Sequence, residues 1–166
     1  MPRAGIALGS NLGERLDHLR AAVDALRLLS TPGAPLLAAP VYQTEPRGCP
    51  PGSPDFLNTV IEIEFAGSAR QLHAQTRALE TRLGRSGNAT RNAPRVIDID
   101  LLYVGASCCA GPDLVLPHPG ITRRRFVLQP LCDIRPDLVL PGQSLSIANL
   151  LANLDSGEPP LARVTD

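Results

Sequence analysis

The stretch RNAPRVIDIDLL, Arg91–Leu102, says more about the fold of this chain than any other segment. Apolar residues alternate with the others through its second half, which is the period of a β-strand. In that register one face carries Ile97, Ile99, Leu101 and Tyr103, and the other carries Asp98, Asp100, Leu102 and Val104. The two aspartates therefore leave the same face of the predicted strand, roughly 7 Å apart along it.

These two carboxylates are candidate metal ligands. Magnesium prefers oxygen ligands and is usually bound by one or two carboxylates, with substrate phosphates completing the octahedron. Arg85, Arg91 and Arg95 lie just upstream, and the planar guanidinium group suits bidentate phosphate binding. Together the residues indicate a metal–polyphosphate site. A solvated strand face balanced by nearby arginines would use the same residues, and the two aspartates alone do not decide between these readings.

Length and charge place the chain among single-domain globular proteins. Its 166 residues can bury a core, and sixteen acidic residues balance sixteen basic ones, so the overall charge favours neither a nucleic acid nor a membrane as partner. Every basic residue is arginine, which excludes a phosphate loop with a lysine. No apolar run could span a membrane and Met1–Arg3 does not begin a signal peptide, so a cytoplasmic protein is expected.

The four cysteines do not suggest a metal site. Cys49, Cys108, Cys109 and Cys132 lack the spacing of zinc ligands. We expect reduced thiols without a functional role, as a cytosolic compartment would keep them.

Periodicity and turn signals predict the order β-α-β-β-α-β. The expected elements are a strand at Ala4–Leu8, a helix at Glu14–Leu29, strands at Leu36–Gln43 and Phe56–Phe65, a helix from the capping box Ser68–Gln71 to Gly84, and the strand with the two aspartates. This order is typical of a ferredoxin-like α+β fold, in which two helices cover one face of an antiparallel sheet.

The remaining segments add to this fold without suggesting a second domain. Thr44–Pro54 is rich in proline and glycine and is expected to be a loop. An amphipathic segment at Thr122–Leu131 and a short helix at Ile147–Leu154 follow the last predicted strand. One domain over residues 1–166 is expected, with a loose tail after about Ser156.

Six motifs resemble the hydroxymethyl-dihydropterin pyrophosphokinases of folate biosynthesis, in that family's order. They are ALGSNLG at 7–13, VYQTEP at 41–46, PDFLN at 54–58, LGR at 83–85, RNAPRVIDIDLL at 91–102 and LPHPGITRRRF at 116–126. The resemblance implies a ferredoxin-like fold and an ATP- and Mg-dependent enzyme with two Mg²⁺ ions. It also implies transfer of the terminal diphosphate of ATP to the hydroxymethyl group of the pterin, with release of AMP. We expect a monomer whose ligands are ATP and hydroxymethyl-dihydropterin.

The same resemblance implies roles for individual residues. Asp98 and Asp100 match the metal ligands and, with Arg85 and Arg95, the catalytic set. The positions that match ATP-binding residues are Arg85, Arg91, Arg95, His118, Arg124 and Glu80. Arg123 and Arg125 are expected to be solvated helix charges. Taken singly, His118 could instead be a structural histidine and Glu80 a helix-surface acid.

For the pterin, Phe56 and Phe126 match the two aromatic residues that sandwich the ring. Asn58 carries both a donor and an acceptor for the edge of the ring, and Thr44 completes that edge. Without the resemblance, the two phenylalanines could be core residues and Asn58 a polar group at a strand end. In the predicted alternation, Phe56 and Asn58 lie opposite the core residues Leu57, Ile61 and Ile63.

Four positions depart from the family pattern. Asn92 replaces the usual tryptophan, Ala93 a glycine, Gly87 a loop arginine and Glu45 a proline. We expect a weaker or slower closure of the loop around ATP. Two alternatives remain at this stage: a domain that binds the pterin without turnover, and a metal-dependent nucleotide hydrolase.

Overall fold

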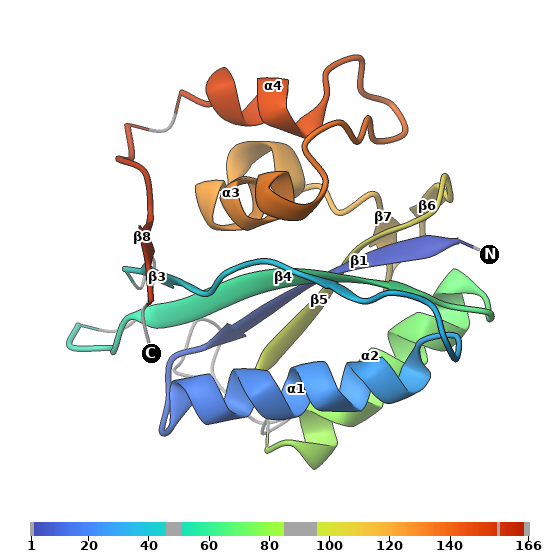
Figure 1. Cartoon of the computed structure of the whole chain (residues 1–166), viewed down its shortest axis with the longest axis horizontal. Helices are drawn as coiled ribbons and strands as arrows, with labels where there is room; N and C mark the ends of the chain where they lie inside the picture. Colours follow the sequence, from blue (N-terminus) through green and yellow to red (C-terminus); the bar gives the residue numbers. More distant parts are fainter. Residues whose placement is uncertain (1, 46–50, 85–95, 156, 165–166) are drawn as a thin grey trace.

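The computed structural model describes residues 2–45, 51–84, 96–155 and 157–164, which form an antiparallel sheet with helices on both faces (Figure 1). The strands lie in the order β5 (Asp98–Val104), β1 (Arg3–Ser10), β4 (Phe56–Glu64), β3 (Tyr42–Thr44) and β8 (Ala162–Arg163), and β2 (Leu37–Ala38) also pairs with β4. A separate hairpin is formed by β6 (Cys109–Ala110) and β7 (Val115–Leu116). The predicted α+β order is confirmed.

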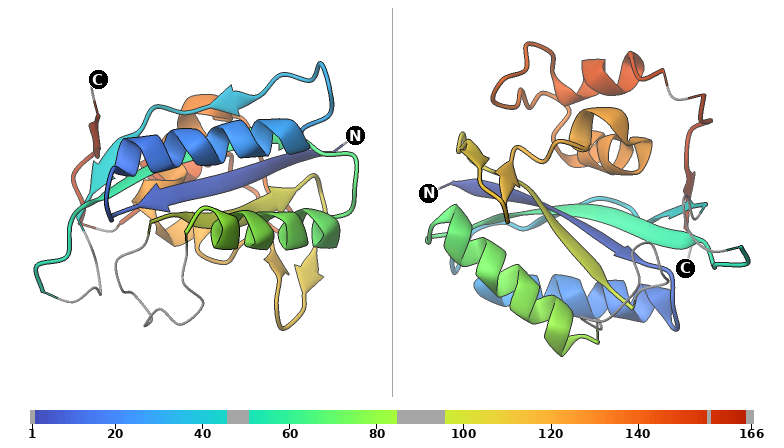
Figure 2. Two further views of the ribbon diagram at one scale, coloured as in Figure 1. Left: turned by 90° about the horizontal axis from the view of Figure 1, so that it is seen from below. Right: turned by 180° about the vertical axis from the view of Figure 1, so that it is seen from behind.

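One face of the sheet is covered by α1 (Arg15–Leu29) and α2 (Ala69–Arg82), which lie side by side (Figure 2, left). The predicted capping box begins α2, where Ser68 Oγ accepts from the Gln71 amide at 3.1 Å and Gln71 Oε1 accepts from the Ser68 amide at 2.7 Å. The core on this face includes Ile6, Leu8, Leu19, Leu26, Ile61, Ile63, Leu72, Leu79, Ile97 and Ile99.

The opposite face is covered by α3 (Arg125–Ile134), and α4 (Ile147–Ala152) packs on the side of α3 that points away from the sheet (Figure 1). The 3₁₀ turn η1 (Ile121–Arg123) precedes α3. The amphipathic segment predicted at Thr122–Leu131 thus forms a helix that begins and ends three residues further along the chain, at Arg125–Ile134. The core on this face includes Val60, Leu102, Tyr103, Leu128, Leu131, Leu140 and Ile147. The packing of α3 on this face, opposite α1 and α2, explains why β4 is buried on both faces.

Two details of the predicted strands are wrong. The strand expected at Leu36–Gln43 is broken into β2 and β3 around Pro40, which has no N–H to donate to a ladder. In β5 the register against β1 shifts between Gly5 and Ile6, so that Leu102 and Tyr103 both pack in the α3 core. This irregularity places Tyr103 on the α3 side of the sheet and not on the α1–α2 side that strict alternation predicts. There the ring lies directly over Gly5, since an added Cβ at Gly5 would lie 2.2 Å from the ring.

The expected loose tail is also wrong for residues 157–164. Ala162 and Arg163 pair with Gln43 and Tyr42, and the Val164 amide donates to Val41 O at 2.8 Å. Within the described part of the chain, no helix is long and apolar enough to cross a membrane. Cys108, Cys109 and Cys132 are free thiols, and Cys49 lies outside the described residues.

Candidate functional site

A cavity of about 570 Å³ lies between the sheet and the start of α3. Its lining brings together residues from six segments of the chain: Ala7–Gly9 of β1, Asp98 and Asp100 of β5, Phe56 and Asn58 of β4, Thr44 of β3, Arg124 and Phe126 at the start of α3, and Glu158–Ala162 near the C-terminus. Seven of the residues predicted for metal, ATP or pterin thus line a single cavity.

The aspartates stand at one edge of the sheet. Asp98 pairs with Gly9 and Asp100 with Ala7, so both lie on the side of β5 that faces the cavity, while Ile99 between them is buried in the α1–α2 core. Both carboxylates are half-buried. A polar ligand in the cavity can therefore reach both of them.

Asn58 and Thr44 form the polar part of the cavity toward the other edge. Asn58 Nδ2 donates to Thr44 Oγ1 at 2.6 Å. Gly9 makes room for this amide, since an added Cβ there would lie 2.8 Å from Asn58 Oδ1. Because Asn58 supplies the donor of this bond, the Thr44 hydroxyl can itself donate to a ligand, and Asn58 Oδ1 can accept.

Phe56 is positioned by the residues that precede it. The Asp55 carbonyl accepts from Arg15 Nη1 at 2.7 Å, and the Asp55 carboxylate accepts from Gln43 Nε2 at 2.8 Å. Asn11 Nδ2 donates to Pro54 O at 3.4 Å. These bonds tie the entry of β4 to α1 and β3, so that Phe56 enters the sheet opposite Thr44.

Arg124 and Phe126 begin α3 and form one unit. The Arg124 guanidinium lies 5.8 Å from the centre of the Phe126 ring, within the range of a cation–π contact. The Arg124 side chain passes close to Gly120, where an added Cβ would lie 2.8 Å from its Nε. Arg123, expected only as a solvated charge, also lines the cavity. The start of α3 thus offers cationic groups beside an aromatic ring.

His118 precedes this cationic group in the chain and is not among the described residues that line the cavity. Its amide donates to Leu102 O at 2.7 Å, and its Nδ1 accepts from the Gly120 amide at 2.9 Å. Burial lowers the pKa of His118, and the positive charges of Arg124 and Arg123 lower it further against the opposing effect of Asp98. The histidine is therefore a neutral side chain near neutral pH, within electrostatic reach of Asp98 and Arg124.

Glu80 lies on the other side of β5. It is buried on α2, its Oε2 accepts from the Ile99 amide at 3.4 Å, and its Oε1 pairs with Arg77 at 3.3 Å. Glu80 is absent from the residues that line the cavity, and its contact is with the backbone between the two aspartates. Its role in ATP binding stays a prediction.

The predicted arginines Arg85, Arg91 and Arg95 lie outside the described residues, as do Gly87, Asn92 and Ala93. Their roles stay predictions. Glu45, the fourth departure from the family pattern, lines the cavity next to Thr44.

The C-terminal lining was missed by sequence reasoning. Glu158, Pro159, Pro160, Leu161 and Ala162 line the cavity, although the tail shows neither strand nor helix periodicity. Only the length of the tail and its run of two prolines could have hinted at an ordered segment.

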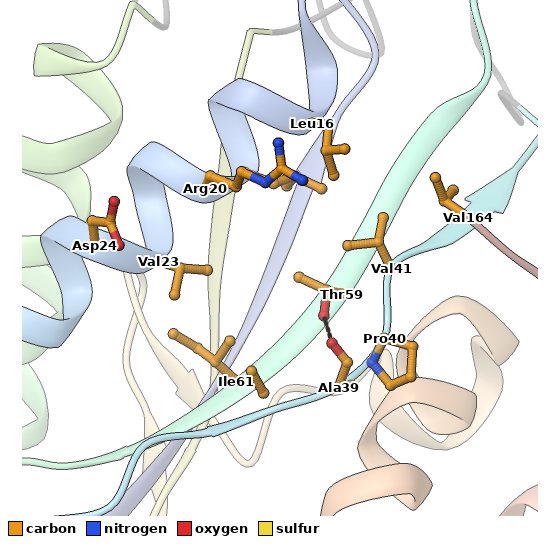
Figure 3. Close-up of a pocket in the computed structure, with 12 residues that line it drawn as sticks. Leu16, Arg20, Val23, Asp24, Ala39, Pro40, Val41, Thr59, Ile61 and Val164 are labelled. Atoms are coloured by element: carbon orange, nitrogen blue, oxygen red, sulfur yellow. Dashed lines mark hydrogen bonds between the residues drawn. The ribbon is translucent and has the colours of Figure 1, made fainter. Parts of the chain in front are cut away.

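A second hollow, of about 450 Å³, lies on the other side of the sheet between α1 and the segment from β2 to β3 (Figure 3). Its lining is mostly aliphatic, and Thr59 Oγ1 donates to Ala39 O at 3.0 Å across it. Among the described residues of this lining, the charged ones are Arg20 and Asp24. The described part of this lining contains neither paired carboxylates nor aromatic rings, in contrast to the first cavity.

Comparison with known proteins agrees with this geometry. Residues 5–136 match the family described as 7,8-dihydro-6-hydroxymethylpterin-pyrophosphokinase (HPPK). The chain is 38% identical over 156 residues to the 2-amino-4-hydroxy-6-hydroxymethyldihydropteridine pyrophosphokinase of Methylorubrum extorquens, covering 93% of this chain and 95% of that protein.

Two longer proteins are also similar. The folic acid synthesis protein fol1 of Pneumocystis carinii is 35% identical over 145 residues, which cover 87% of this chain and 19% of that protein. A crystal structure of Plasmodium falciparum HPPK-DHPS superposes with a TM-score of 0.71 at 12% identity over 91% of this chain and 44% of that chain, which supports the fold. The chain thus corresponds to only part of each of these proteins.

The match over most of the chain and the cavity with its paired aspartates lead to one assignment. The chain belongs to the 7,8-dihydro-6-hydroxymethylpterin-pyrophosphokinase family, and it is an ATP-using pyrophosphokinase of folate biosynthesis.

Proposed function

We propose that this enzyme transfers diphosphate from ATP to the hydroxymethyl group of hydroxymethyl-dihydropterin in the cavity between the sheet and α3. The observation that carries the proposal is that Asp98 and Asp100 line the same cavity as Phe56, Asn58 and Phe126. A general phosphate site needs no pair of aromatic rings, and a simple pterin-binding pocket needs no pair of carboxylates.

The strand order suggests how the two substrates lie. The aspartates are on β5, and Phe56 and Asn58 are on β4, two strands away. Adjacent strands are about 4.8 Å apart, so the phosphate end and the pterin end are separated by about 10 Å across the sheet. The diphosphate to be transferred would lie between them, over Ala7, Leu8 and Gly9 of β1, which also line the cavity.

Asp98 and Asp100 fit magnesium by the chemistry of their donors. Within the described ranges no group of three or more histidine, cysteine or acidic side chains could hold a metal ion. Two carboxylates on one strand face suit ions whose other ligands are phosphate oxygens and water. Two Mg²⁺ ions held there would neutralise charge on the attacking and leaving oxygens.

The protein's own part is to orient the substrates and stabilise charge. The pterin hydroxyl oxygen forms a bond to the β-phosphorus of ATP, the bond from that phosphorus to the α–β bridging oxygen breaks, and AMP and the hydroxyl proton are released. Arg124 supplies fixed positive charge toward the triphosphate, and neutral His118 can donate a hydrogen bond through Nε2. By resemblance, Arg85, Arg91 and Arg95 add further charge.

At the pterin end, Phe56 and Phe126 would sandwich the ring, which is worth roughly 0.5–1.5 kcal/mol beyond the area buried. Thr44 and Asn58 would pair with its polar edge. We further propose that the enzyme acts as a monomer in the cytoplasm.

An assay of product formation tests this function. The protein is incubated with Mg-ATP, with and without hydroxymethyl-dihydropterin, and the adenine nucleotides are separated. AMP formed only in the presence of the pterin is the expected result. Absence of AMP under both conditions would indicate a pterin-binding domain, and AMP or ADP formed regardless of the pterin would indicate a nucleotide hydrolase.

A further inference from the structure

Residues 157–164, which we call the C-terminal segment, run from beyond α4 to the outer edge of the sheet (Figure 1). β8 extends the sheet beyond β3, on the side opposite β5. Five residues of the segment, Glu158–Ala162, line the cavity. The segment therefore lies near the pterin end of the site and far from the two aspartates.

The pairing of β8 places the segment more closely. Tyr42 lies opposite Arg163 and Gln43 opposite Ala162. Continuing this antiparallel register by one residue brings Leu161 opposite Thr44. Thr44 is bonded to Asn58, so the segment borders the polar group that meets the pterin edge.

A single side chain of α3 holds the segment at this point. Gln129 Oε1 accepts from the Leu161 amide at 2.9 Å, and Gln129 Nε2 donates to Leu161 O at 3.3 Å. The side-chain amide thus satisfies both backbone groups of Leu161, as a neighbouring strand would. Gln129 follows Phe126 by three residues, which puts both side chains on the same side of the helix.

A second tether is independent of Gln129. Arg163 pairs with Asp133 of α3 at 3.6 Å, and its guanidinium lies 6.0 Å from the centre of the Tyr42 ring. The Arg163 side chain is 62% exposed, so its removal leaves no hole in the core. Both tethers connect the segment to α3, the helix that carries Phe126.

The chemistry of the segment suits a ligand edge that is rich in donors. Pro159 and Pro160 have no backbone N–H, and the N–H of Leu161 is used by Gln129. Toward a ligand, residues 159–161 can offer only carbonyl acceptors and apolar surface. The fixed φ of the two prolines also reduces the conformational freedom that the segment would lose when a ligand binds.

We propose that the C-terminal segment is a wall of the pterin end of the cavity and that Gln129 is the residue that positions it. The proposal rests on the proposed function, since the occupant is the ring of hydroxymethyl-dihydropterin. Gln129 acts through Leu161 and does not itself touch the substrate. Loss of its two hydrogen bonds should release the wall and weaken pterin binding, while the ATP end of the site, at the other edge of the sheet, is unaffected.

The test compares Gln129→Leu with Gln143→Leu, a matched change at an exposed glutamine outside the cavity. For Gln129→Leu we expect the KM for the pterin to rise about tenfold, with kcat and the KM for ATP within a factor of two. Calorimetry with a non-hydrolysable ATP analogue should show the same change in pterin Kd. Hydrogen exchange of the Leu161 amide should be faster in this variant. Gln143→Leu should behave as the wild type in all five quantities: the two KM values, kcat, the pterin Kd and the exchange of the Leu161 amide.

Arg163→Ala releases the second tether and provides a variant that should fold. The pterin KM is expected to rise about two- to threefold. Faster exchange at Leu161 with an unchanged pterin KM would overturn the proposal, because the segment would then be free without consequence. A parallel loss of kcat, of both KM values and of thermal stability in Gln129→Leu would also overturn it, since Gln129 would then only support α3.

A failure of the proposed function can be distinguished from a failure of the wall proposal. If the wild-type protein forms no AMP, the reaction assigned above is wrong, and calorimetry of pterin binding still compares Gln129→Leu with the wild type. Equal pterin affinity in that comparison, or no pterin binding by the wild type, would exclude the wall.

Discussion

The two faces of the main sheet are buried in different ways. The α1–α2 face buries aliphatic side chains, and its buried acid, Glu80, bonds to the backbone of β5. The α3–α4 face buries a carboxylate between strands and helix: Glu62 is fully buried and pairs with Arg3 at 2.9 Å and with Arg135 at 2.6 Å. Tyr103 also donates a hydrogen bond to Glu62. The pKa of Tyr103 is raised, mainly by burial and further by this hydrogen bond.

This difference relates structure to function. The α1–α2 face is closed by two long helices and supplies most of the aliphatic core. The α3–α4 face is closed only in part, and the ends of β4 and β5 that it leaves uncovered line the cavity. A metal-bound polyphosphate needs cationic groups, carboxylate ligands for the metal ion and water, which an aliphatic core cannot provide. We therefore expect substitutions on the two faces to separate turnover from stability.

The largest effect is expected at the aspartates. Asp98→Ala or Asp100→Ala should lower kcat by about 10³-fold or more, because each removes a proposed metal ligand and its charge at the reacting phosphate. Thermal stability should change little, since both side chains are half-buried and face the cavity. Asp24→Ala, at an exposed position on α1, is the matched control and should keep full activity. Near-normal turnover of either variant at low magnesium concentration would contradict the metal assignment.

The next largest effect concerns pterin binding. Phe126→Ala should weaken pterin binding by roughly 2–4 kcal/mol, the value of one stacked face and its burial, while ATP affinity stays nearly constant. Isothermal titration with each ligand measures both. Phe65→Ala, a half-buried aromatic residue packed on the α1–α2 core, should instead lower stability without changing pterin affinity. If Phe126→Ala is destabilised and still binds the pterin normally, Phe126 is a core residue.

Features of the fold that follow from the local sequence were predicted correctly, whereas features that depend on a neighbouring strand were not. The alternation in β4 and β5 placed Phe56, Asn58 and the two aspartates on one side of the sheet, because side-chain direction in a strand follows from position alone. The same rule misplaced Tyr103, since the shift in β5 depends on the register of β1 and not on β5 itself.

The tail and Glu62 show the other limit. The C-terminal segment is ordered by Gln129, 32 residues away, and no local period marks such a contact. Glu62 reads as a solvated residue in the alternation of β4, yet it is buried because α3 covers that face and brings Arg135 to it. Pairings made only in the folded chain were beyond sequence pattern, whereas Pro40 was a local signal that could have been used.

A third prediction tests the polar core beneath the site. Glu62→Gln should lower the free energy of unfolding by about 2–3 kcal/mol, because it leaves two arginines without their counter-charge. The arginine side chains are 24% and 33% exposed, so water offsets part of the loss. Denaturant unfolding measures the change, and Glu64→Gln at the end of the same strand should stay within about 0.5 kcal/mol. Unchanged stability of Glu62→Gln would mean that the pairs add nothing net.

The smallest effect concerns pH. The pKa of His118 is lowered in the folded protein, chiefly by burial, so that below about pH 6.5 the unfolded chain takes up this proton more readily. The stability linked to neutral His118 is thus fully present above the unfolded pKa and is lost as the pH falls below it. His118→Asn keeps an acceptor for the Gly120 amide and cannot titrate in this range.

The unfolding free energy of His118→Asn should therefore fall less steeply than that of the wild type between about pH 7 and about pH 5. His73→Asn keeps His118 and should follow the wild type. The measurement is the unfolding free energy of the three proteins at a series of pH values. Parallel pH curves for His118→Asn and the wild type would mean that His118 takes up its proton equally well in the folded and unfolded chain. In that case the burial of His118 beside Arg124, at the start of α3, would give this face of the sheet no pH-dependent contribution to stability that the other face lacks.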